Sequence, residues 1–205
     1  MEALLARVNA LAAQATGRVL IAVAGAPGAG KSTLAERLAD RLGPAAALVP
    51  MDGFHLDNAI LDARGRRFEK GSPDTFDIAG FEAVLLRLKA GGEVIVPVFD
   101  RTIDLSRGSA RVVPPDARII VAEGNYLLLR DAPWDSLARL WDMTVFLDVP
   151  LAELERRLIA RWLGFGLSAT DARHRALAND IPNARRVIAG SAPADIVLTQ
   201  DALGE

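Results

Sequence analysis

The sequence predicts an α/β fold with a mostly parallel central sheet, helices on both faces of the sheet and a small lid. Three observations support this prediction. Short apolar runs alternate with segments of helical spacing along most of the 205 residues. The apolar run 19–24 leads into a glycine-rich turn, and a helical pattern begins at Lys31. The composition, with 51% hydrophobic and 24% charged residues, is that of an ordinary globular protein.

The glycine-rich turn matches a phosphate-binding loop. Gly25, Gly30, Lys31 and Ser32 fill the fixed positions of the motif G-x-x-x-x-G-K-[ST]. In this motif backbone N–H groups curl around an anion, the lysine reaches the β- and γ-phosphates, and the hydroxyl ligates Mg²⁺. A chance glycine-rich turn would not need the strand before it and the helix after it. We therefore expect a P-loop NTPase fold that binds a nucleoside triphosphate with Mg²⁺. The expected nucleotide-binding residues are Gly25, Ala26, Pro27, Gly28, Ala29, Gly30, Lys31, Ser32 and Thr33.

The composition argues against binding to nucleic acid, to an anionic membrane or to zinc. A net charge of -2 gives no reason to expect binding to nucleic acid or to an anionic membrane. Cysteine is absent, and the two histidines, His55 and His174, are too far apart in sequence to suggest a zinc site. The expected metal is therefore nucleotide-bound Mg²⁺.

The N-terminal segment is expected to be an amphipathic helix that packs on the domain. Its apolar residues have helical spacing, but Glu2, Arg7, Asn9 and Gln14 interrupt any continuous apolar signal core. No other segment has the length of a transmembrane helix. At about 100 to 200 residues per domain, the length predicts one domain, 1–205. We expect a cytoplasmic protein, and a homodimer remains open.

The remaining elements follow in order. Apolar runs predict strands at 45–51, 93–99, 118–122, 141–149 and 195–199, with a shorter strand at 111–113. Helical spacing predicts helices at 81–88 and 151–163, the second opened by Pro150. Residues 53–77 are rich in charge, glycine and proline and predict an acceptor-binding loop. The charged stretch 168–186 follows a glycine-rich break and predicts a solvent-facing lid helix, within a lid of about 161–186.

Polar residues directly after strands give the expected site, because ligands bind beyond the carboxyl ends of parallel strands. Besides the phosphate-binding loop, these residues are Asp52, Asp100, Arg101 and Glu123, and all should face one crevice. Asp52 is the candidate for handling an acceptor hydroxyl, with a turn-forming Asp-Gly as the structural alternative. Glu123 ends a strand as a Walker B acid does and would bind Mg²⁺ through water, with a strand-end cap as the alternative.

Basic residues supply candidates for the transferring phosphoryl group and for the acceptor. Arg157 and Arg161 are four residues apart on one helix face, so either could be the lid arginine. A solvated basic face is the alternative. Individually, four further arginines are more typical of a surface: Arg173, Arg175, Arg185 and Arg186. An anionic substrate could be attracted by Lys70, Arg66 and Arg67, with a solvated charge run as the default alternative. The expected acceptor-binding residues are Asp52, His55, Lys70, Arg101, Asn125 and Arg161.

Beyond the phosphate-binding loop, ordered motifs resemble the kinase superfamily of uridine kinase, phosphoribulokinase and bacterial-type pantothenate kinase. These motifs are MDGFHLDN, KGSPDTFD, PVFDRTID, VAEGNYLLL, IARWLGF and ADIVLT, and the resemblance runs from Arg18 to about Thr199. It implies an ATP-dependent small-molecule kinase, with Asp52 in the catalytic acidic position and Arg161 in that of the lid arginine. Lys31 and Glu123 are the other two expected catalytic residues. The expected metal-binding residues are Ser32 and Glu123.

Two departures from the pantothenate kinase pattern bear on the acceptor. Where those enzymes carry an aromatic hydroxyl and a histidine that touch the acceptor, this sequence has Phe99 and Arg101. The shorter chain and the stretch NDIPNARRV resemble instead a branch described as fructose transport system kinases or nucleoside/nucleotide kinase family proteins. That resemblance implies a sugar acceptor such as fructose.

Three functional hypotheses therefore stand. The first is a kinase that phosphorylates a hydroxyl of a sugar, polyol, nucleoside or pantothenate-like metabolite. The second is a nucleotide-dependent regulator of a transport system, although the sequence has no Asn-Lys-x-Asp guanine motif. The third is a degenerate kinase that only binds nucleotide, against which Lys31, Ser32, Asp52 and Glu123 argue together.

Overall fold

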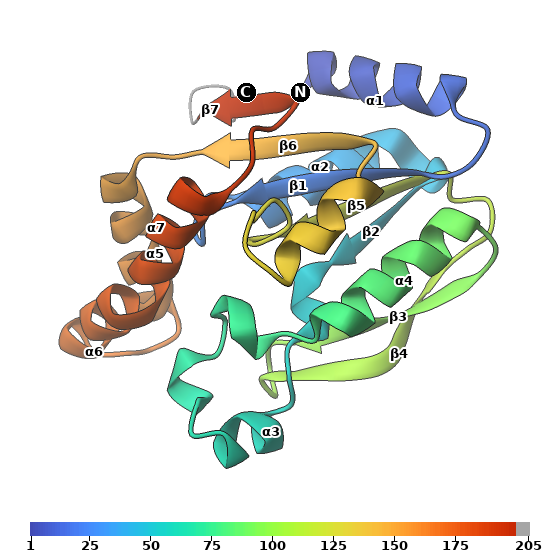
Figure 1. Ribbon diagram of the computed structural model, residues 1–205. Coiled ribbons are helices and arrows are strands. Elements are labelled where there is room, and N and C mark those ends of the chain that lie inside the picture. Colours follow the sequence, from blue (N-terminus) through green and yellow to red (C-terminus); the bar gives the residue numbers. More distant parts are fainter. Residues whose placement is uncertain (200–205) are drawn as a thin grey trace.

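The central sheet has five parallel strands in the order β2-β5-β1-β6-β7 (Figure 1). The computed structural model describes residues 1–199, and the last residues of the expected domain, 200–205, lie outside it. The strands of this sheet are β1 (Val19–Gly25), β2 (Ala46–Pro50), β5 (Ile119–Gly124), β6 (Met143–Asp148) and β7 (Ile196–Thr199). The predicted α/β fold is confirmed.

The two central strands explain why the sequence reads as continuous apolar runs. Every residue of β1 and of β5 is buried, because both faces of the sheet are covered. The register pairs Val23 with Glu123, and Pro50 of β2 pairs with Glu123 from the other side. The ends of three neighbouring strands therefore meet at one edge.

Helices cover both faces of the sheet. In Figure 1, α2 (Lys31–Leu42) lies behind the sheet, and α4 (Ile78–Ala90) lies in front with the 3₁₀ helix Trp134–Leu140. The predicted N-terminal helix is α1 (Glu2–Gln14). The apolar side chains of these helices join those of the sheet in one buried cluster.

The strand expected at 93–99 does not belong to the central sheet, which corrects the expectation that it ends beside the carboxyl ends of the parallel strands. Instead, β3 (Val94–Asp100) pairs antiparallel with β4 (Leu105–Val113) in a separate two-stranded sheet. Only the last three residues of β4 were expected as a strand. Most of β4 is exposed, so its sequence shows no apolar run that would predict it.

The segment 53–77 contains more regular structure than the expected loop. It includes α3 (Asn58–Ala63) and two 3₁₀ turns, Arg67–Glu69 and Pro73–Thr75. The Asp57 carboxylate caps α3 by accepting a hydrogen bond from the Ala59 N–H at 2.8 Å. Short local hydrogen bonds thus order a segment without an apolar period.

A group of helices lies beyond the carboxyl ends of the central strands (Figure 1). It comprises α5 (Leu151–Gly164), α6 (Ala169–Arg175), a π-helical turn (Ala176–Asp180) and α7 (Ile181–Gly190). Pro150 is the N-cap of α5 rather than part of its first turn. One side of the stretch from α6 to α7 is buried, which corrects the expectation of a simple solvent-facing helix. Within residues 1–199, none of the helices combines the length and apolarity that a bilayer crossing needs.

Candidate active site

A cleft of about 720 Å³ lies between the phosphate-binding loop, the segment 53–77 and the helices that follow β6. Its lining includes thirteen of the predicted site residues: Pro27, Gly28, Gly30, Lys31, Ser32, Thr33, Asp52, His55, Lys70, Arg101, Glu123, Asn125 and Arg161. The others, Gly25, Ala26 and Ala29, are buried and do not line the cleft. Asp100 was expected in the crevice but is not among its lining residues. Its carboxylate instead accepts a hydrogen bond from the Thr102 hydroxyl at 2.6 Å and lies 3.2 Å from Arg107.

The phosphate-binding loop has the backbone geometry of an anion cradle. Gly28 and Gly30 adopt φ angles of 80° and 97°, a left-handed region that favours glycine. A Cβ at Gly25 would lie 2.9 Å from the carbonyl oxygen of Leu147, so this position also requires glycine. The loop therefore fits phosphate groups bound through backbone N–H groups.

Lys31 and Glu123 form the buried charged floor of the cleft. They are 7% and 6% exposed, and the Lys31 ammonium donates to the carbonyl oxygen of Ala26 at 3.0 Å. Burial lowers the pKa of Lys31, and the negative charges of Glu123 and Asp52 oppose that shift. Burial also raises the pKa of Glu123, with Lys31 opposing it.

Ser32 and Glu123 lie where a metal partner of the nucleotide is expected. The Ser32 hydroxyl donates to Glu123 Oε1 at 3.2 Å, which brings together two oxygen groups of the kind Mg²⁺ prefers. Among residues 1–199 there is no group of three or more His, Cys, Asp or Glu side chains that could hold a metal by itself. The pair therefore fits Mg²⁺ that arrives with phosphate ligands and water.

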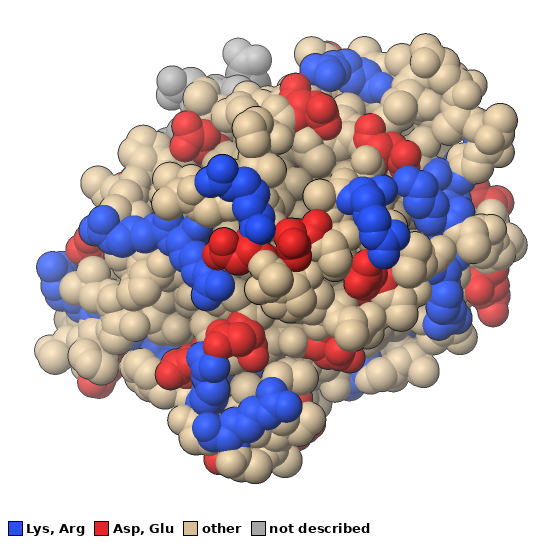
Figure 2. Space-filling view, viewed as in Figure 1, with Lys and Arg blue, Asp and Glu red and all other residues tan. Residues whose placement is uncertain are grey.

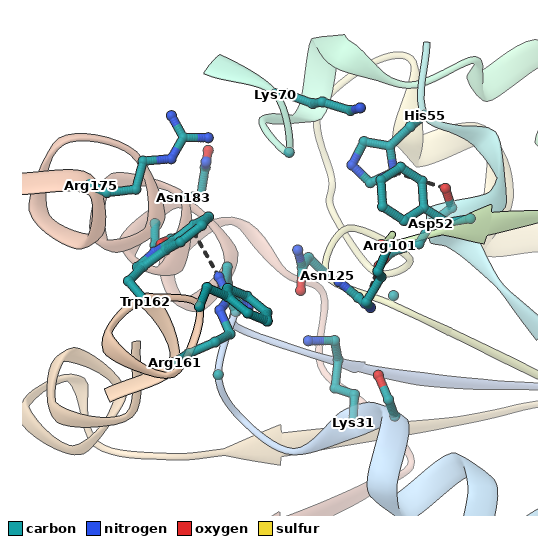
Figure 3. Close-up of a pocket in the computed structure, with 18 of the residues that line it drawn as sticks. Lys31, Asp52, His55, Lys70, Arg101, Asn125, Arg161, Trp162, Arg175 and Asn183 are labelled. Atoms are coloured by element: carbon teal, nitrogen blue, oxygen red, sulfur yellow. Dashed lines mark hydrogen bonds and ion pairs between the residues drawn. The ribbon is translucent and has the colours of Figure 1, made fainter. Parts of the chain in front are cut away.

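Asp52 follows β2 and faces the cleft from the acceptor side. Its carboxylate accepts a hydrogen bond from Arg101 at 2.9 Å, and its side chain is 28% exposed. Arg101 lies in the turn between β3 and β4, and Gly53 allows β3 to approach closely. Figure 3 shows Asp52 and Arg101 above Lys31, with Asn125 between them and the lid residues on the opposite side of the cleft.

His55 and Lys70 form an ordered wall near Asp52. The carbonyl oxygen of Asp52 can only accept, so His55 donates to it through Nδ1 at 2.8 Å. The imidazole packs between Phe76 and Phe99, at centroid distances of 4.1 and 4.7 Å, and burial lowers its pKa. The Lys70 ammonium donates to Asn58 at 2.7 Å and lies 2.9 Å from the Asp104 carboxylate.

The two candidate lid arginines contact different groups. Arg157 lies 2.7 Å from Glu153 and donates to the carbonyl oxygen of Gly28 in the phosphate-binding loop at 3.3 Å. Arg161 lies 3.3 Å from Asp180 and stacks over Trp162. Both arginines line the cleft.

Sequence reasoning missed a group of cleft residues on α5, the π turn and α7. Trp162 donates to Asp180 through its indole N–H at 2.6 Å, and Asn183 donates to Asn179 at 3.2 Å. Phe165 also lines the cleft, and so does Arg175, which was expected to be a surface residue. The signal was a set of polar residues at positions 179, 180 and 183, which share one helix face otherwise occupied by apolar residues.

A phosphate-binding loop with a buried lysine, an acid at the end of the neighbouring strand and arginines above the cleft define a P-loop kinase. The chain belongs to the phosphoribulokinase/uridine kinase family, whose model matches residues 20–161. It is an ATP-dependent kinase of that family and uses ATP with Mg²⁺.

Three relatives show how far the similarity extends. The crystal structure of a "putative fructose transport system kinase" from Silicibacter sp. TM1040 has 44% sequence identity and a TM-score of 0.89, covering 95% of this chain and 98% of that one. A "putative uridine kinase" from Schizosaccharomyces pombe is 37% identical, over 89% of this chain and 83% of its own. A pantothenate kinase from Sorangium cellulosum is 34% identical, over 70% of this chain and 49% of its own.

Proposed function

We propose that this protein transfers the γ-phosphoryl group of ATP to a hydroxyl of a small sugar or sugar-like metabolite. The observation that carries the proposal is the Asp52 carboxylate, which faces the cleft opposite the phosphate-binding loop and is held by Arg101 at 2.9 Å. A carboxylate in this place can orient an acceptor hydroxyl and take its proton.

The neighbouring residues fit the rest of the reaction. Lys31 would stabilise negative charge on the β- and γ-phosphates, and Ser32 and Glu123 would hold the metal. When bound, Mg²⁺ would offset negative charge on the phosphate groups. Arg161 would place a second cation against the transferring group after leaving Asp180, while Arg157 would steady the phosphate-binding loop through Gly28.

We propose a single domain, 1–205, in which two segments at the edge of the cleft have separate functions. Residues 53–77 would bind the acceptor, because His55 and Lys70 line the cleft beside Asp52. Residues 161–186 would form the lid, because they lie beyond the strand ends and carry Arg161. Closure of such a segment would exclude water from the transfer.

Two acceptor classes have specific support. A sugar such as fructose is favoured by the 44% identity to the Silicibacter protein, which is itself described only as a putative fructose transport system kinase. A nucleoside is the second candidate, favoured by the aromatic wall of Phe76, His55 and Phe99 and by the uridine kinase relative. Phe99 and Arg101 argue against pantothenate.

The test is Mg-ATP consumption with a panel of sugars, polyols, nucleosides and pantothenate, followed by mass spectrometry of each product. We expect one acceptor to gain a single phosphate. Asp52→Asn should retain ATP binding but lower turnover by about two orders of magnitude or more. Near-normal turnover in that variant would remove Asp52 from the mechanism. ATP binding without any phosphorylated acceptor would favour the regulator of a transport system instead.

A further inference from the structure

The arginines above the cleft contact successive parts of it. Arg157 reaches the phosphate-binding loop through Gly28, and Arg161 is paired with Asp180 farther along the lid. Arg175, from the end of α6, donates instead to the carbonyl oxygen of Phe68, which belongs to the acceptor segment 53–77. Arg175 is therefore a lid arginine that contacts the acceptor segment directly.

Charge pairing distinguishes Arg175 from most other cations of the cleft. Five of the seven basic side chains that line the cleft have a carboxylate partner within 4.0 Å: Arg67, Lys70, Arg101, Arg157 and Arg161. Within the part of the chain that the structure describes, Lys31 and Arg175 have none. Lys31 belongs to the phosphate-binding loop, where the nucleotide supplies its negative charge. The nucleotide gives no comparable account of the negative charge that Arg175 would bind.

The guanidinium of Arg175 is also held in a fixed orientation. It stacks over Phe68 at 4.7 Å and over Trp162 at 5.3 Å, measured from Cζ to each ring centroid. Stacking uses the faces of the guanidinium and leaves its edges, with five N–H donors, for hydrogen bonds. The Phe68 carbonyl takes one of these donors. A preorganised fork of this kind matches the oxygens of a carboxylate or a phosphate.

Arg175 lies across the cleft from Asp52, the residue proposed to handle the acceptor hydroxyl. Figure 3 shows Arg175 and Asn183 on the wall opposite Asp52 and His55, with the cleft between them. A molecule that spans the cleft would thus place one end at Arg175 and a hydroxyl at Asp52. We propose that the acceptor carries an anionic group, a carboxylate or a phosphate ester, and that Arg175 binds that group. This proposal rests on the kinase function proposed above.

The test compares matched neutral and acidic acceptors in the wild-type protein. D-glucose and D-gluconate form the carboxylate pair, and D-fructose and D-fructose 6-phosphate form the phosphate pair. We expect the acidic member of at least one pair to have a kcat/KM at least about tenfold above that of its neutral partner. The pair that shows the preference distinguishes a carboxylate from a phosphate.

Arg175→Gln should then raise the KM for the preferred acid by about ten- to one hundredfold, the size expected for a lost charge-assisted hydrogen bond. The KM for ATP should stay unchanged, and Arg175→Lys should recover part of the preference. Arg173→Gln is the matched control: it lies on the same helix, is 62% exposed in its side chain and pairs with Glu155. It should leave both KM values unchanged.

If Arg175→Gln merely disturbed the structure of the lid, kcat/KM would fall equally for both members of a pair. The ratio of acidic to neutral kcat/KM therefore measures the effect of the acceptor's charge alone. Preference for the neutral member, or an unchanged ratio in Arg175→Gln, would overturn the anionic acceptor and leave the kinase function standing. ATP consumption with no phosphorylated product across both pairs and the broader panel would overturn the kinase proposal, and this inference with it.

Discussion

The side of the cleft proposed to bind the nucleotide (the nucleotide side) and the side proposed to bind the acceptor (the acceptor side) differ in what holds their polar groups. On the nucleotide side, Lys31 and Glu123 are almost fully buried at the ends of a sheet whose central strands are covered on both faces. On the acceptor side, Arg101 is 65% exposed in its side chain and stands on a hairpin outside that sheet. The first arrangement depends on the core, and the second on polar contacts between surface segments.

The difference indicates how one fold can serve different acceptors. The groups proposed to handle ATP, Lys31 at the start of α2 and Glu123 in β5, are packed into the core and cannot shift without disturbing it. The groups proposed to meet the acceptor are joined by contacts such as Lys70 with Asp104, between the segment 53–77 and the turn after β3. Figure 2 shows basic and acidic side chains intermingled over the face that carries these segments. Such contacts can be replaced with little cost to the fold, so acceptor preference can change while ATP use is retained.

Removal of the buried cation should have the largest effect. Lys31→Ala is expected to lower kcat by about 10²–10³-fold, because a preorganised donor is lost from the phosphate groups. The loss should be similar for every acceptor, since it lies on the nucleotide side. Arg37→Ala, an exposed change on the same helix, is the control. Steady-state kinetics with two acceptors would test this, and unchanged kinetics in Lys31→Ala would contradict the role of the loop.

The contact between Gly53 and β3, which we call the joint, should be the next most sensitive position to substitution. A Cβ at Gly53 would lie 2.7 Å from the backbone carbonyl oxygen of Pro97 in β3. Gly53→Ala should therefore push the hairpin away, lower the free energy of unfolding by about 1–3 kcal/mol and separate Arg101 from Asp52.

Gly108→Ala is the matched control for the joint. It changes a glycine of the same hairpin, but an added Cβ there would meet no atom within 4 Å. Urea unfolding of both variants measures the difference. Equal stability of Gly53→Ala and Gly108→Ala would mean that the close approach of the hairpin is not required.

The same contrast explains what the sequence could predict. The strands β1, β5 and β6 are apolar runs, so the parallel sheet and the residues just beyond it, including Asp52 and Glu123, could be placed in one cleft before the structure was known. The rule depends only on strand direction. The catalytic and binding roles of these residues stay predictions.

The hairpin could not be placed in this way. The run 93–99 resembles a buried strand of the main sheet, and β4 carries six consecutive exposed residues that show no apolar period. Asp100 and Arg101 were therefore both assigned to the cleft, whereas only Arg101, in the antiparallel turn, lines it. Trp162 and Asp180 were missed for a related reason, because residues at helical spacing resemble packing positions until a partner element is known.

Weakening the acceptor side should have the smallest effect. The Asp104 carboxylate lies 2.9 Å from the ammonium of Lys70, whose side chain is only 7% exposed, and 3.9 Å from Arg67. Asp104 has a φ angle of 53°, which asparagine also tolerates, so Asp104→Asn removes the charge without straining the turn. Because the carboxylate itself is 55% exposed, the free energy of unfolding should fall by only about 1 kcal/mol.

Salt and a neighbouring control show whether that loss is electrostatic. The difference between wild type and Asp104→Asn should shrink as salt rises from about 0.1 M to about 1 M, because the Debye length falls from about 10 Å to about 3 Å. Asp62→Asn breaks a pair with Arg67 in which both side chains are exposed, so it should cost less than Asp104→Asn. The KM for ATP should be the same in both variants, since neither residue touches the nucleotide side. Equal losses in the two variants, or a loss that salt does not reduce, would show that the acceptor side is not held by the Lys70–Asp104 pair.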